Sequence, residues 1–301
     1  MANLKQQPKS SGFLGIKEIG VAEPPQKMVI ENDAPSIGKA VSQYVDTIIR
    51  HICAREEAEP TVNPEYMSLQ RDITTRMRAI LVDWLVDVNL KFKMKPQTFF
   101  MTVGIIDRFL AVREVSRQKL QLVGVAALMI VGKYEEIYPP LLKDYVAVCD
   151  NAFTREEMVA MESEILLALD FDLNKTCCFV FLEYFRERLG LQERVFVFCR
   201  YLLENALLDA SYLRFNQLTL AAGAILLVNK IFKKDSWPLL YEQISGVSES
   251  RAKACAKELF AMISRADFSP LTAIKRKFAE PEMFEVSKYK IEKVPAPPSQ
   301  I

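Results

Sequence analysis

Histidine and cysteine are scarce in this chain, which has one histidine and 6 cysteines among 301 residues. No two cysteines form a C-x-x-C pair, and His51 has no second metal-ligand residue at a useful spacing. The cysteines stand mostly in apolar runs, which is typical of reduced core thiols in an intracellular protein. We therefore expect no metal site, and a single histidine leaves little scope for His-based acid–base or nucleophilic catalysis.

Glycine is also rare, with 10 residues, and few of them stand in pairs or in turns that follow strands. Phosphate-binding loops and dinucleotide-binding folds need glycine-rich turns after strands, and the sequence offers neither. Acidic pairs such as Glu135-Glu136 are typical of solvated helix ends rather than of catalytic sites. We expect a protein that is not an enzyme and that carries no cofactor.

Long apolar runs and an excess of one charge are missing as well. The longest uncharged run, residues 215–229, has 15 residues, whereas a membrane span needs about 20. No apolar segment follows the first charges of the chain, as a secretory signal would require. Lys plus Arg number 39 and Asp plus Glu 38, a net charge of +1, which does not favour bulk binding to nucleic acid or anionic membranes.

Helix-forming residues fill the middle of the chain, and half of all residues are hydrophobic. Apolar side chains recur at helical spacing, and prolines interrupt the pattern. We predict an all-α protein. Asp72 is the predicted N-cap of the second helix, and Thr154 begins a capping-box-like sequence. The expected helices cover about 41–52, 73–90, 96–110, 120–134, 143–149, 154–169, 176–188, 193–209, 215–231, 238–245 and 248–265.

A weak internal repeat divides the ten helices that follow the N-terminal one into two sets of five. Residues 123–133 read VGVAALMIVGK, residues 220–230 read LAAGAILLVNK, and the two segments lie 230 − 133 = 97 residues apart. We predict two tandem five-helix bundles joined by a linker over residues 170–175. The expected organisation is a disordered tail over 1–37, an N-terminal helix and loop over 38–69, bundles over 70–174 and 175–270, and a C-terminal tail over 271–301, extended over the surface after Lys277.

The helix predicted over residues 73–90 has two apolar faces. Two narrow polar strips separate these faces, one with Arg78 and Asn89 and the other with Asp83 and Asp87. A helix of this kind either lies in the centre of the core or uses one face to dock a partner. The first face consists of Met77, Ile80, Leu81, Trp84 and Val88, and the second of Ala79, Val82, Val86 and Leu90.

Three motifs in this part of the chain resemble the cyclin family in its A/B-type mitotic branch. They are MRAILVDWL at 77–85, KLQLVG at 119–124 and KYEEIYPP at 133–140. The resemblance implies two tandem five-helix cyclin boxes with an extra N-terminal helix. It also implies a regulatory subunit that binds and activates a cyclin-dependent serine/threonine kinase in cell-cycle control, located in the nucleus and cytoplasm.

The resemblance further assigns two sets of charged residues. Arg78 and Asp107 match an internal ion pair, while Lys133 and Glu162 match the charged pair that holds the kinase. From the residues alone, extension of Lys133 and Glu162 to solvent is the favoured interpretation, and the N-terminal helix could equally pack on its own chain. We define the kinase face as Lys133, Glu162, the apolar residues Tyr134, Leu166, Phe171 and Leu173 expected around them, and Tyr44 and Ile48 of the N-terminal helix.

A docking face for Arg-x-Leu-type substrates or inhibitors is the second surface that the resemblance implies. An apolar socket beside Asp83 and Asp87 would suit a leucine and a basic residue of a short peptide. We define the docking face as Met77, Ile80, Leu81, Trp84, Asp83, Asp87, Leu120 and Gln121. Two other functions fit an all-α chain, a tandem cyclin-fold transcription-factor-like module that binds DNA or polymerase, and a helical-repeat scaffold.

Overall fold

The computed structural model describes residues 35–58, 62–232, 237–266 and 269–289. The described part of the chain divides into two units between Val45 and Asp46. Helix α1 (Pro35–Ala58) begins in the first unit and continues into the second. The described residues form helices and no strand, as predicted. The disordered tail expected over 1–37 lies outside the described residues except for 35–37, which are already helical.

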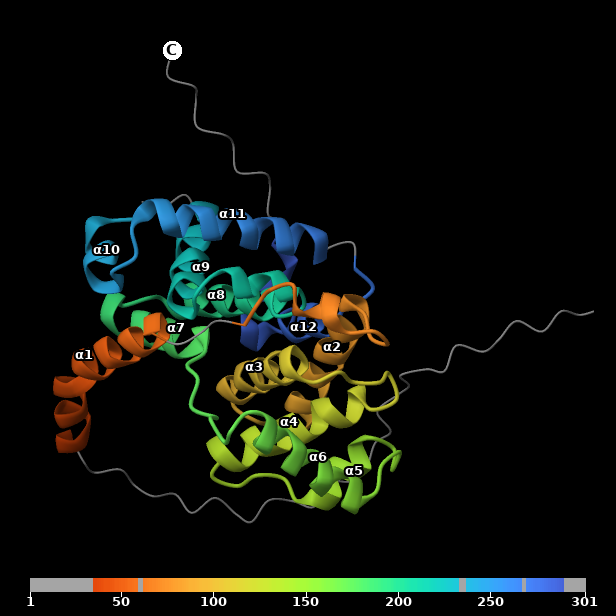
Figure 1. The fold of residues 1–301 in the computed structure, drawn as a ribbon. Coiled ribbons are helices and arrows are strands. Elements are labelled where there is room, and N and C mark those ends of the chain that lie inside the picture. Colours follow the sequence, from red (N-terminus) through yellow and green to blue (C-terminus); the bar gives the residue numbers. More distant parts are fainter. Residues whose placement is uncertain (1–34, 59–61, 233–236, 267–268, 290–301) are drawn as a thin grey trace, which may run out of the picture. The chain divides into compact units, whose positions relative to one another are not determined.

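Five helices of the second unit form a first bundle around α4, as predicted. Helix α4 contacts α2, α3, α5 and α6, and Figure 1 shows it among them. Its interior carries no charge, so it can be covered on all sides. The bundle consists of α2 (Thr75–Lys91), α3 (Pro96–Val112), α4 (Leu120–Glu135), α5 (Leu142–Val148) and α6 (Arg155–Ala168).

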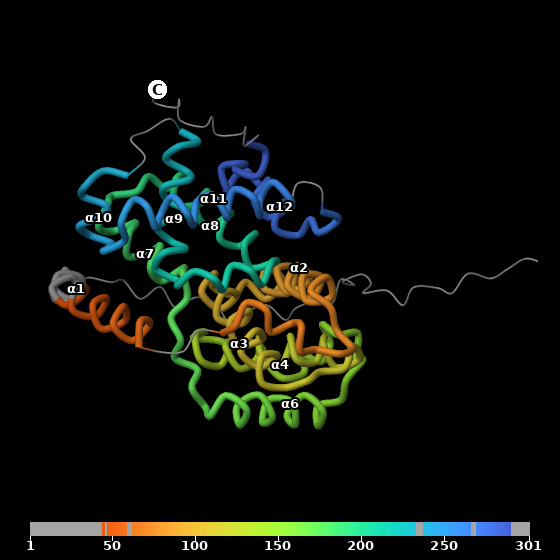
Figure 2. The backbone as a smooth tube through the Cα atoms, turned by 45° about the horizontal axis from the view of Figure 1, so that its top comes forward, coloured from red at the N-terminus to blue at the C-terminus, as the bar shows by residue number. Residues whose placement is uncertain are grey.

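Five more helices form a second bundle, and α9 takes the place that α4 has in the first. Helix α9 packs against α7, α8 and α11, and the tube in Figure 2 shows it between them. The repeated segments 123–133 and 220–230 lie in α4 and α9, so the predicted duplication is confirmed. The bundle consists of α7 (Cys178–Leu189), α8 (Glu193–Ala206), α9 (Gln217–Ile231), α10 (Leu239–Ser245) and α11 (Glu249–Ala266).

Side-chain caps explain where several helices begin. Thr154 and Glu157 form the predicted capping box of α6, each side chain accepting a backbone N–H from the other residue. Helix α2 differs from the prediction, because Thr74 rather than Asp72 accepts the N–H of Met77. Asp72 instead accepts the backbone N–H and the guanidinium of Arg117, each at 2.8 Å, because it stands two residues too early to reach the first turn of the helix.

Close approach of α2 to α4 requires glycine at one position. A Cβ on Gly124 would lie 2.6 Å from Cδ1 of Leu81, well inside van der Waals contact. Between α9 and α11, a Cβ on Gly223 would meet Sγ of Cys255 at 2.6 Å. The small residues of both central helices therefore let neighbouring helices pack closely.

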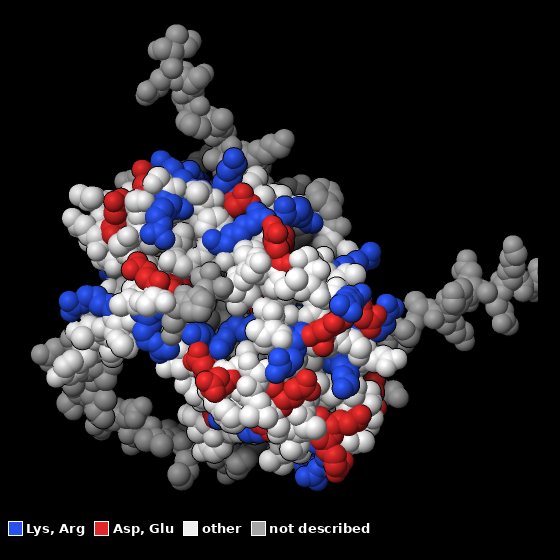
Figure 3. Space-filling view, viewed as in Figure 1, with Lys and Arg blue, Asp and Glu red and all other residues white. Residues whose placement is uncertain are grey.

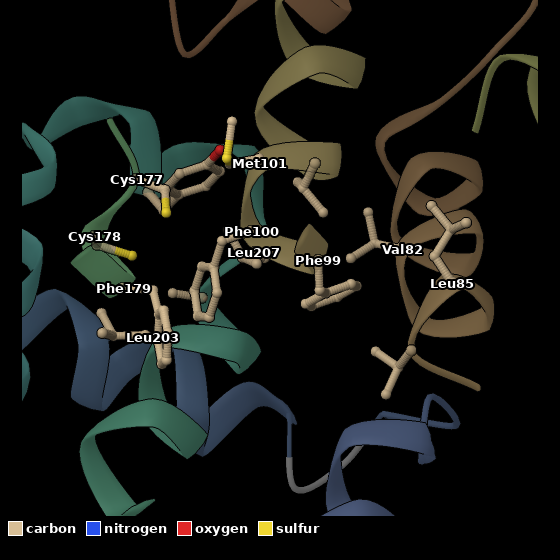
Figure 4. Packing of buried hydrophobic residues seen from close by; sticks show 14 of the residues in the cluster. Val82, Leu85, Phe99, Phe100, Met101, Cys177, Cys178, Phe179, Leu203 and Leu207 are labelled. Carbon is tan, nitrogen blue, oxygen red and sulfur yellow. The ribbon is translucent and has the colours of Figure 1, made fainter. Parts of the chain in front are cut away.

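The hydrophobic core runs from the first bundle into the second without interruption. Figure 4 shows the junction, where side chains of α2 and α3 meet those of α7 and α8. Phe100 stacks on Phe179 with ring centroids 5.6 Å apart and planes 15° from parallel, a favourable aromatic geometry. The two bundles therefore share apolar packing as well as a linker.

The segment that follows α11 folds back onto both bundles. It forms α12 (Ala273–Lys277) and two short 3-10 helices, η3 (Pro281–Met283) and η4 (Val286–Lys288). Phe278 and Val286 are fully buried. The predicted extended path after Lys277 is therefore wrong for the described part, because these apolar side chains drive the segment into the core. Residues 290–301 lie outside the described residues.

A buried ion pair within the first bundle makes hydrogen bonds that reach the second bundle. Arg78 of α2 and Asp107 of α3 are 1% and 0% exposed, and Nε and Nη2 of Arg78 donate to the two carboxylate oxygens at 2.6 and 2.8 Å. Tyr66 of η1 (Tyr66–Leu69) and Tyr212 of η2 (Ala210–Arg214) each donate a hydroxyl to Asp107. Nη1 of Arg78 donates to the carbonyl of Leu207, at 2.8 Å, in the second bundle.

Arg78 keeps its positive charge although water cannot reach it. Burial has the largest single effect on the pKa of Arg78 and pulls it down, but the charge and hydrogen bond of Asp107, together with Tyr66 and Tyr212, outweigh it, so the pKa is raised overall. Burial and the same carboxylate raise the pKa of Tyr66 and Tyr212, so both hydroxyls keep their protons and continue to donate. The predicted ion pair is therefore confirmed, and the two tyrosines and the carbonyl of Leu207 complete it.

We expect Arg78→Met to lower the free energy of unfolding by about 3–5 kcal/mol, because it leaves the Asp107 carboxylate buried without a cation. The matched control is Arg117→Gln, which removes an exposed partner of Asp72 and should cost no more than about 1 kcal/mol. Urea denaturation of the three proteins measures both values. Equal stability of Arg78→Met and the control would contradict a structural role for the buried pair.

Candidate functional site

The docking face on α2 is apolar and only partly accessible. Met77, Ile80 and Trp84 are partly exposed and lie along one side of the helix. Leu81 and Leu120 are fully buried, so the expectation that they are part of the exposed surface is wrong. Leu81 points into α4 at Gly124, and Leu120 begins α4 within the core. Both leucines are therefore part of the core and cannot contact a ligand directly.

The acidic strip of the docking face is already engaged within the chain. Asp83 accepts the backbone N–H of Ala273 at 3.0 Å. Asp87 accepts two hydrogen bonds from Nη2 of Arg276, at 2.8 and 3.1 Å. Burial raises the pKa of Asp83, and the N–H of Ala273 opposes that effect. The prediction of two carboxylates open to a peptide is therefore wrong, because α12 lies against this strip.

The charged pair of the kinase face forms at the C-terminal end of α4. Nζ of Lys133 donates to Oε1 of Glu162 on α6. The two side chains are 49% and 17% exposed, so the carboxylate is largely shielded while the ammonium group reaches the surface. The alternative in which both side chains extend separately into solvent does not hold, since each is the other's partner.

Two residues with positive φ turn the chain after α6. Asp170 and Phe171 have φ of 52° and 54°, and the N–H of Phe171 donates to the carbonyl of Leu166 at 2.9 Å. This turn leaves the ring of Phe171 62% exposed, whereas Leu166 and Leu173 are half-buried. The predicted apolar residues therefore lie close to the end of α6, with Phe171 the most accessible.

Exposed apolar side chains around this site extend beyond the predicted set. Tyr134 is 51% exposed, and Ile137 and Tyr138 in the next loop are 79% and 87% exposed. Leu141, just before α5, is 61% exposed, and Leu167, on α6, is 71% exposed. Periodicity could not indicate the three loop residues, but Leu167 stands where an amphipathic α6 would carry a polar residue. Adjacent exposed apolar residues of this size are typical of a protein–protein interface.

Helix α1 carries two exposed apolar side chains and, farther along, a residue that anchors it. Tyr44 and Ile48 are one turn apart on α1 and are 60% and 50% exposed. Farther along α1, the carboxylate of Glu56 accepts the backbone N–H groups of Gln217 and Leu218 at the start of α9. The end of α1 therefore packs on its own chain, the alternative considered for this helix, while its exposed residues remain available to a partner.

Most of the cysteine thiols are buried and protonated. All six cysteines are free, and only Cys53 is not buried. Burial raises the pKa of Cys177 to about 11 and of Cys149 and Cys255 to about 12, so these thiols stay protonated at neutral pH. Among the described residues, no three His, Cys, Asp or Glu side chains lie together as metal ligands.

No helix within the described ranges has the length and apolar character needed to cross a membrane.

Charges of both signs are mixed on one face of the molecule. On the face shown in Figure 3, Lys and Arg alternate with Asp and Glu over short distances. Such a mixture does not create the continuous basic field that attracts a nucleic-acid backbone.

Two family models match this chain in tandem. The model described as "Cyclin, N-terminal domain" matches residues 47–174, and that described as "Cyclin, C-terminal domain" matches residues 176–292. Together they account for more than half of the chain, and their boundary at 174–176 falls in the linker between the two bundles.

Curated relatives with these domains are mitotic cyclins. The chain is 35% identical over 247 residues to the G2/mitotic-specific cyclin-B of Marthasterias glacialis, covering 82% of this chain and 63% of the relative. It is 34% identical over 260 residues to the human G2/mitotic-specific cyclin-B2, covering 86% and 65%. This chain thus spans less than two thirds of the length of the curated relatives it matches.

A solved viral cyclin from herpesvirus saimiri has the same fold. Its TM-score is 0.65 at 20% sequence identity, and the match covers 73% of this chain and 97% of the viral chain.

The buried and the exposed residues of the docking face can be distinguished by how much their substitution lowers the free energy of unfolding. Leu81→Ala should lower the free energy of unfolding by about 2–5 kcal/mol, because it opens a cavity against α4. Met77→Ala removes a partly exposed side chain and should cost less than about 1.5 kcal/mol. Guanidinium denaturation provides both numbers. If Met77→Ala costs as much as Leu81→Ala, Met77 belongs to the core and cannot serve a ligand.

Proposed function

Because the chain belongs to the cyclin family, we propose that it is the regulatory subunit of a cyclin-dependent serine/threonine protein kinase. In this proposal it has no catalytic activity of its own, and it acts in mitotic cell-cycle control, in the nucleus and cytoplasm. The kinase partner and its substrates are proposals because the curated relatives are considerably longer than the part that this chain matches.

The observation that carries the proposal is the kinase face at the ends of α4 and α6. Lys133 and Glu162 form an ion pair that is partly shielded from water, and exposed apolar side chains stand in the neighbouring loop and turn. Shielding of this kind strengthens a charge-assisted hydrogen bond relative to one in open solvent. An apolar surface with a fixed charged pair at its edge supports specific binding to another protein.

The proposed mechanism is a shift in the conformational population of the kinase. A kinase samples states in which its regulatory helix lies inward or outward, and only the inward state completes the site for phosphoryl transfer. If the kinase face contacts the inward state more favourably, binding increases its population in proportion to the difference in affinity. The shared core keeps both bundles rigid, so little of the binding free energy is lost in ordering this chain.

Substrate docking on α2 is the second part of the proposal. The partly exposed apolar surface of the docking face is formed by Met77, Ile80 and Trp84. Leu81 and Leu120 are buried in the core. A leucine of an Arg-x-Leu-type substrate or inhibitor could gain roughly 1.5–3 kcal/mol by burial there. Weak docking at a distance from the reaction raises the local concentration of a protein substrate without changing the chemical step.

The activation proposal is tested by the double variant Lys133→Ala, Glu162→Ala. Removing the charged pair of the kinase face should abolish activation of a purified cyclin-dependent kinase at wild-type concentrations, since interface hot spots commonly contribute about 2 kcal/mol or more each. Measurement of kinase activity against variant concentration gives the loss directly, and circular dichroism checks that the helices persist.

The control for this variant is Lys253→Ala, Glu249→Ala. These two residues form an ion pair on α11 with Nζ and Oε1 2.9 Å apart, in which both side chains are exposed, at 50% and 44%, and the change in charge is identical. The control should activate the kinase as the wild type does. Full activation by the Lys133→Ala, Glu162→Ala variant would disprove the assigned interface, whereas equal loss in both variants would point to a general effect of charge or folding.

A further inference from the structure

Helix α12 occupies the part of the docking face that a basic peptide would need. Nη2 of Arg276 donates to both carboxylate oxygens of Asp87 at 2.8 and 3.1 Å. The backbone N–H of Ala273, one turn earlier, donates to Asp83 at 3.0 Å. The guanidinium group of Arg276 thus already binds the carboxylate of Asp87, which lies next to the exposed apolar residues of the docking face.

The position of Arg276 is set by the burial of its neighbour. Lys277 is 7% exposed, and its Nζ donates to the two carboxylate oxygens of Glu204 on α8 at 2.8 and 2.7 Å. Arg200 donates to the same carboxylate at 2.8 Å. Consecutive side chains of a helix point about 100° apart, so fixing Lys277 in the second bundle directs Arg276 elsewhere, toward α2.

A second anchor holds the end of α12. The ring of Phe278 is fully buried, and the backbone N–H of Ser287 donates to its carbonyl at 3.2 Å. The hydroxyl of Ser287 donates to the carbonyl of Lys275 at 2.8 Å. Buried contacts on both sides therefore hold the backbone that carries Arg276. This fixed backbone places the Arg276 side chain beside Asp87, so the ion pair does not depend on two freely moving side chains.

Arg276 lies next to the site where a peptide leucine would bind. Ile80, Trp84 and Asp87 are spaced four and then three residues apart, so they form one continuous stripe along α2. The side chain of Arg276 is 65% exposed and that of Asp87 29%. Arg276 makes no hydrogen bond through Nε or Nη1 to a residue that the structure describes, which leaves donors for a ligand beside the stripe.

We propose that Arg276 determines the specificity of the docking face by filling the carboxylate site, so that this face binds a leucine-bearing peptide with an acidic residue where Arg-x-Leu has arginine. This inference rests on the docking part of the proposed function. A peptide arginine would have to displace Arg276 from Asp87 and would meet a like charge on arrival. A peptide glutamate would find unused guanidinium donors and a neutralised Asp87.

The test uses the full chain and two short fluorescein-labelled peptides that differ only in having Glu-x-Leu or Arg-x-Leu. Fluorescence anisotropy measures the dissociation constant of each. The wild type should bind the Glu-x-Leu peptide more tightly. Arg276→Gln should reverse the preference and bind the Arg-x-Leu peptide about tenfold more tightly than the wild type does, since a charge-assisted contact to Asp87 becomes available.

Two further variants make the result specific to this pair of residues. Lys275→Gln removes the same charge from the neighbouring position of α12 and should leave the preference of the wild type unchanged. Asp87→Asn combined with Arg276→Gln should lose the tenfold gain for the Arg-x-Leu peptide, because the carboxylate that receives the arginine is absent. Thermal melting of each variant checks that α12 remains folded.

The possible outcomes separate this inference from the docking proposal on which it depends. If the wild type prefers Arg-x-Leu, or binds it as tightly as Arg276→Gln does, and Trp84→Ala abolishes that binding, docking stands and the role of Arg276 is disproved. If neither peptide binds any variant in a way that depends on Trp84, the docking proposal fails and this inference with it. If Lys275→Gln and Arg276→Gln gained equal affinity for the Arg-x-Leu peptide, the effect would come from the general loss of positive charge, and the specific role of Arg276 would be disproved.

Discussion

The buried ion pair between Arg78 and Asp107 is the constraint on which the arrangement of the two bundles depends. An unpaired charge in this environment would cost several kcal/mol, so every donor and acceptor must be satisfied. The partners come from η1, from η2 and from the end of α8. Because these contacts are directional, they fix how α2 and α3 meet the second bundle more sharply than apolar packing alone can.

Both proposed binding faces follow from this arrangement. Arg78 points inward from α2, so Met77, Ile80 and Trp84 are turned outward on the same helix. The second bundle also supplies α8, whose Glu204 holds Lys277 and so brings α12 against the acidic strip of α2. In the first bundle, α4 is covered by its neighbours until its last turn, where Lys133 reaches Glu162 and the surface. The packing of the core therefore determines which residues of α2 and α4 are left exposed to form the two faces.

Helical periodicity was sufficient for most of the architecture. The repeat of residues 123–133 in 220–230 correctly predicted two bundles with equivalent central helices, and the capping sequence at Thr154 located the start of α6. Asp72 was assigned the wrong role because Arg117, which binds it, is distant in sequence. Leu81 was predicted to be part of the docking face and Leu120 to lie beside it, but the structure buries both side chains, Leu81 against Gly124.

The C-terminal segment was the part that local patterns could not predict. Arg276 and Lys277 read as an ordinary basic run, and their opposite environments come from contacts with α2 and α8, both far away in the sequence. The prolines after Lys277 indicated an extended path, whereas two separated aromatic and aliphatic residues, Phe278 and Val286, bury the segment. The exposed loop residues Ile137 and Tyr138 likewise depend on tertiary structure, because no helical period covers them.

Amide hydrogen exchange of the full chain, alone and with a purified cyclin-dependent kinase, tests the central claim most directly. The account predicts that the kinase slows exchange in the segments 133–141 and 162–173, which form the ends of α4 and α6 and the exposed loops that follow them. Exchange in α11 should stay unchanged, since it lies in the second bundle away from the kinase face. Protection confined to α10 and α11, with none at 133–141 or 162–173, would contradict the proposed kinase face.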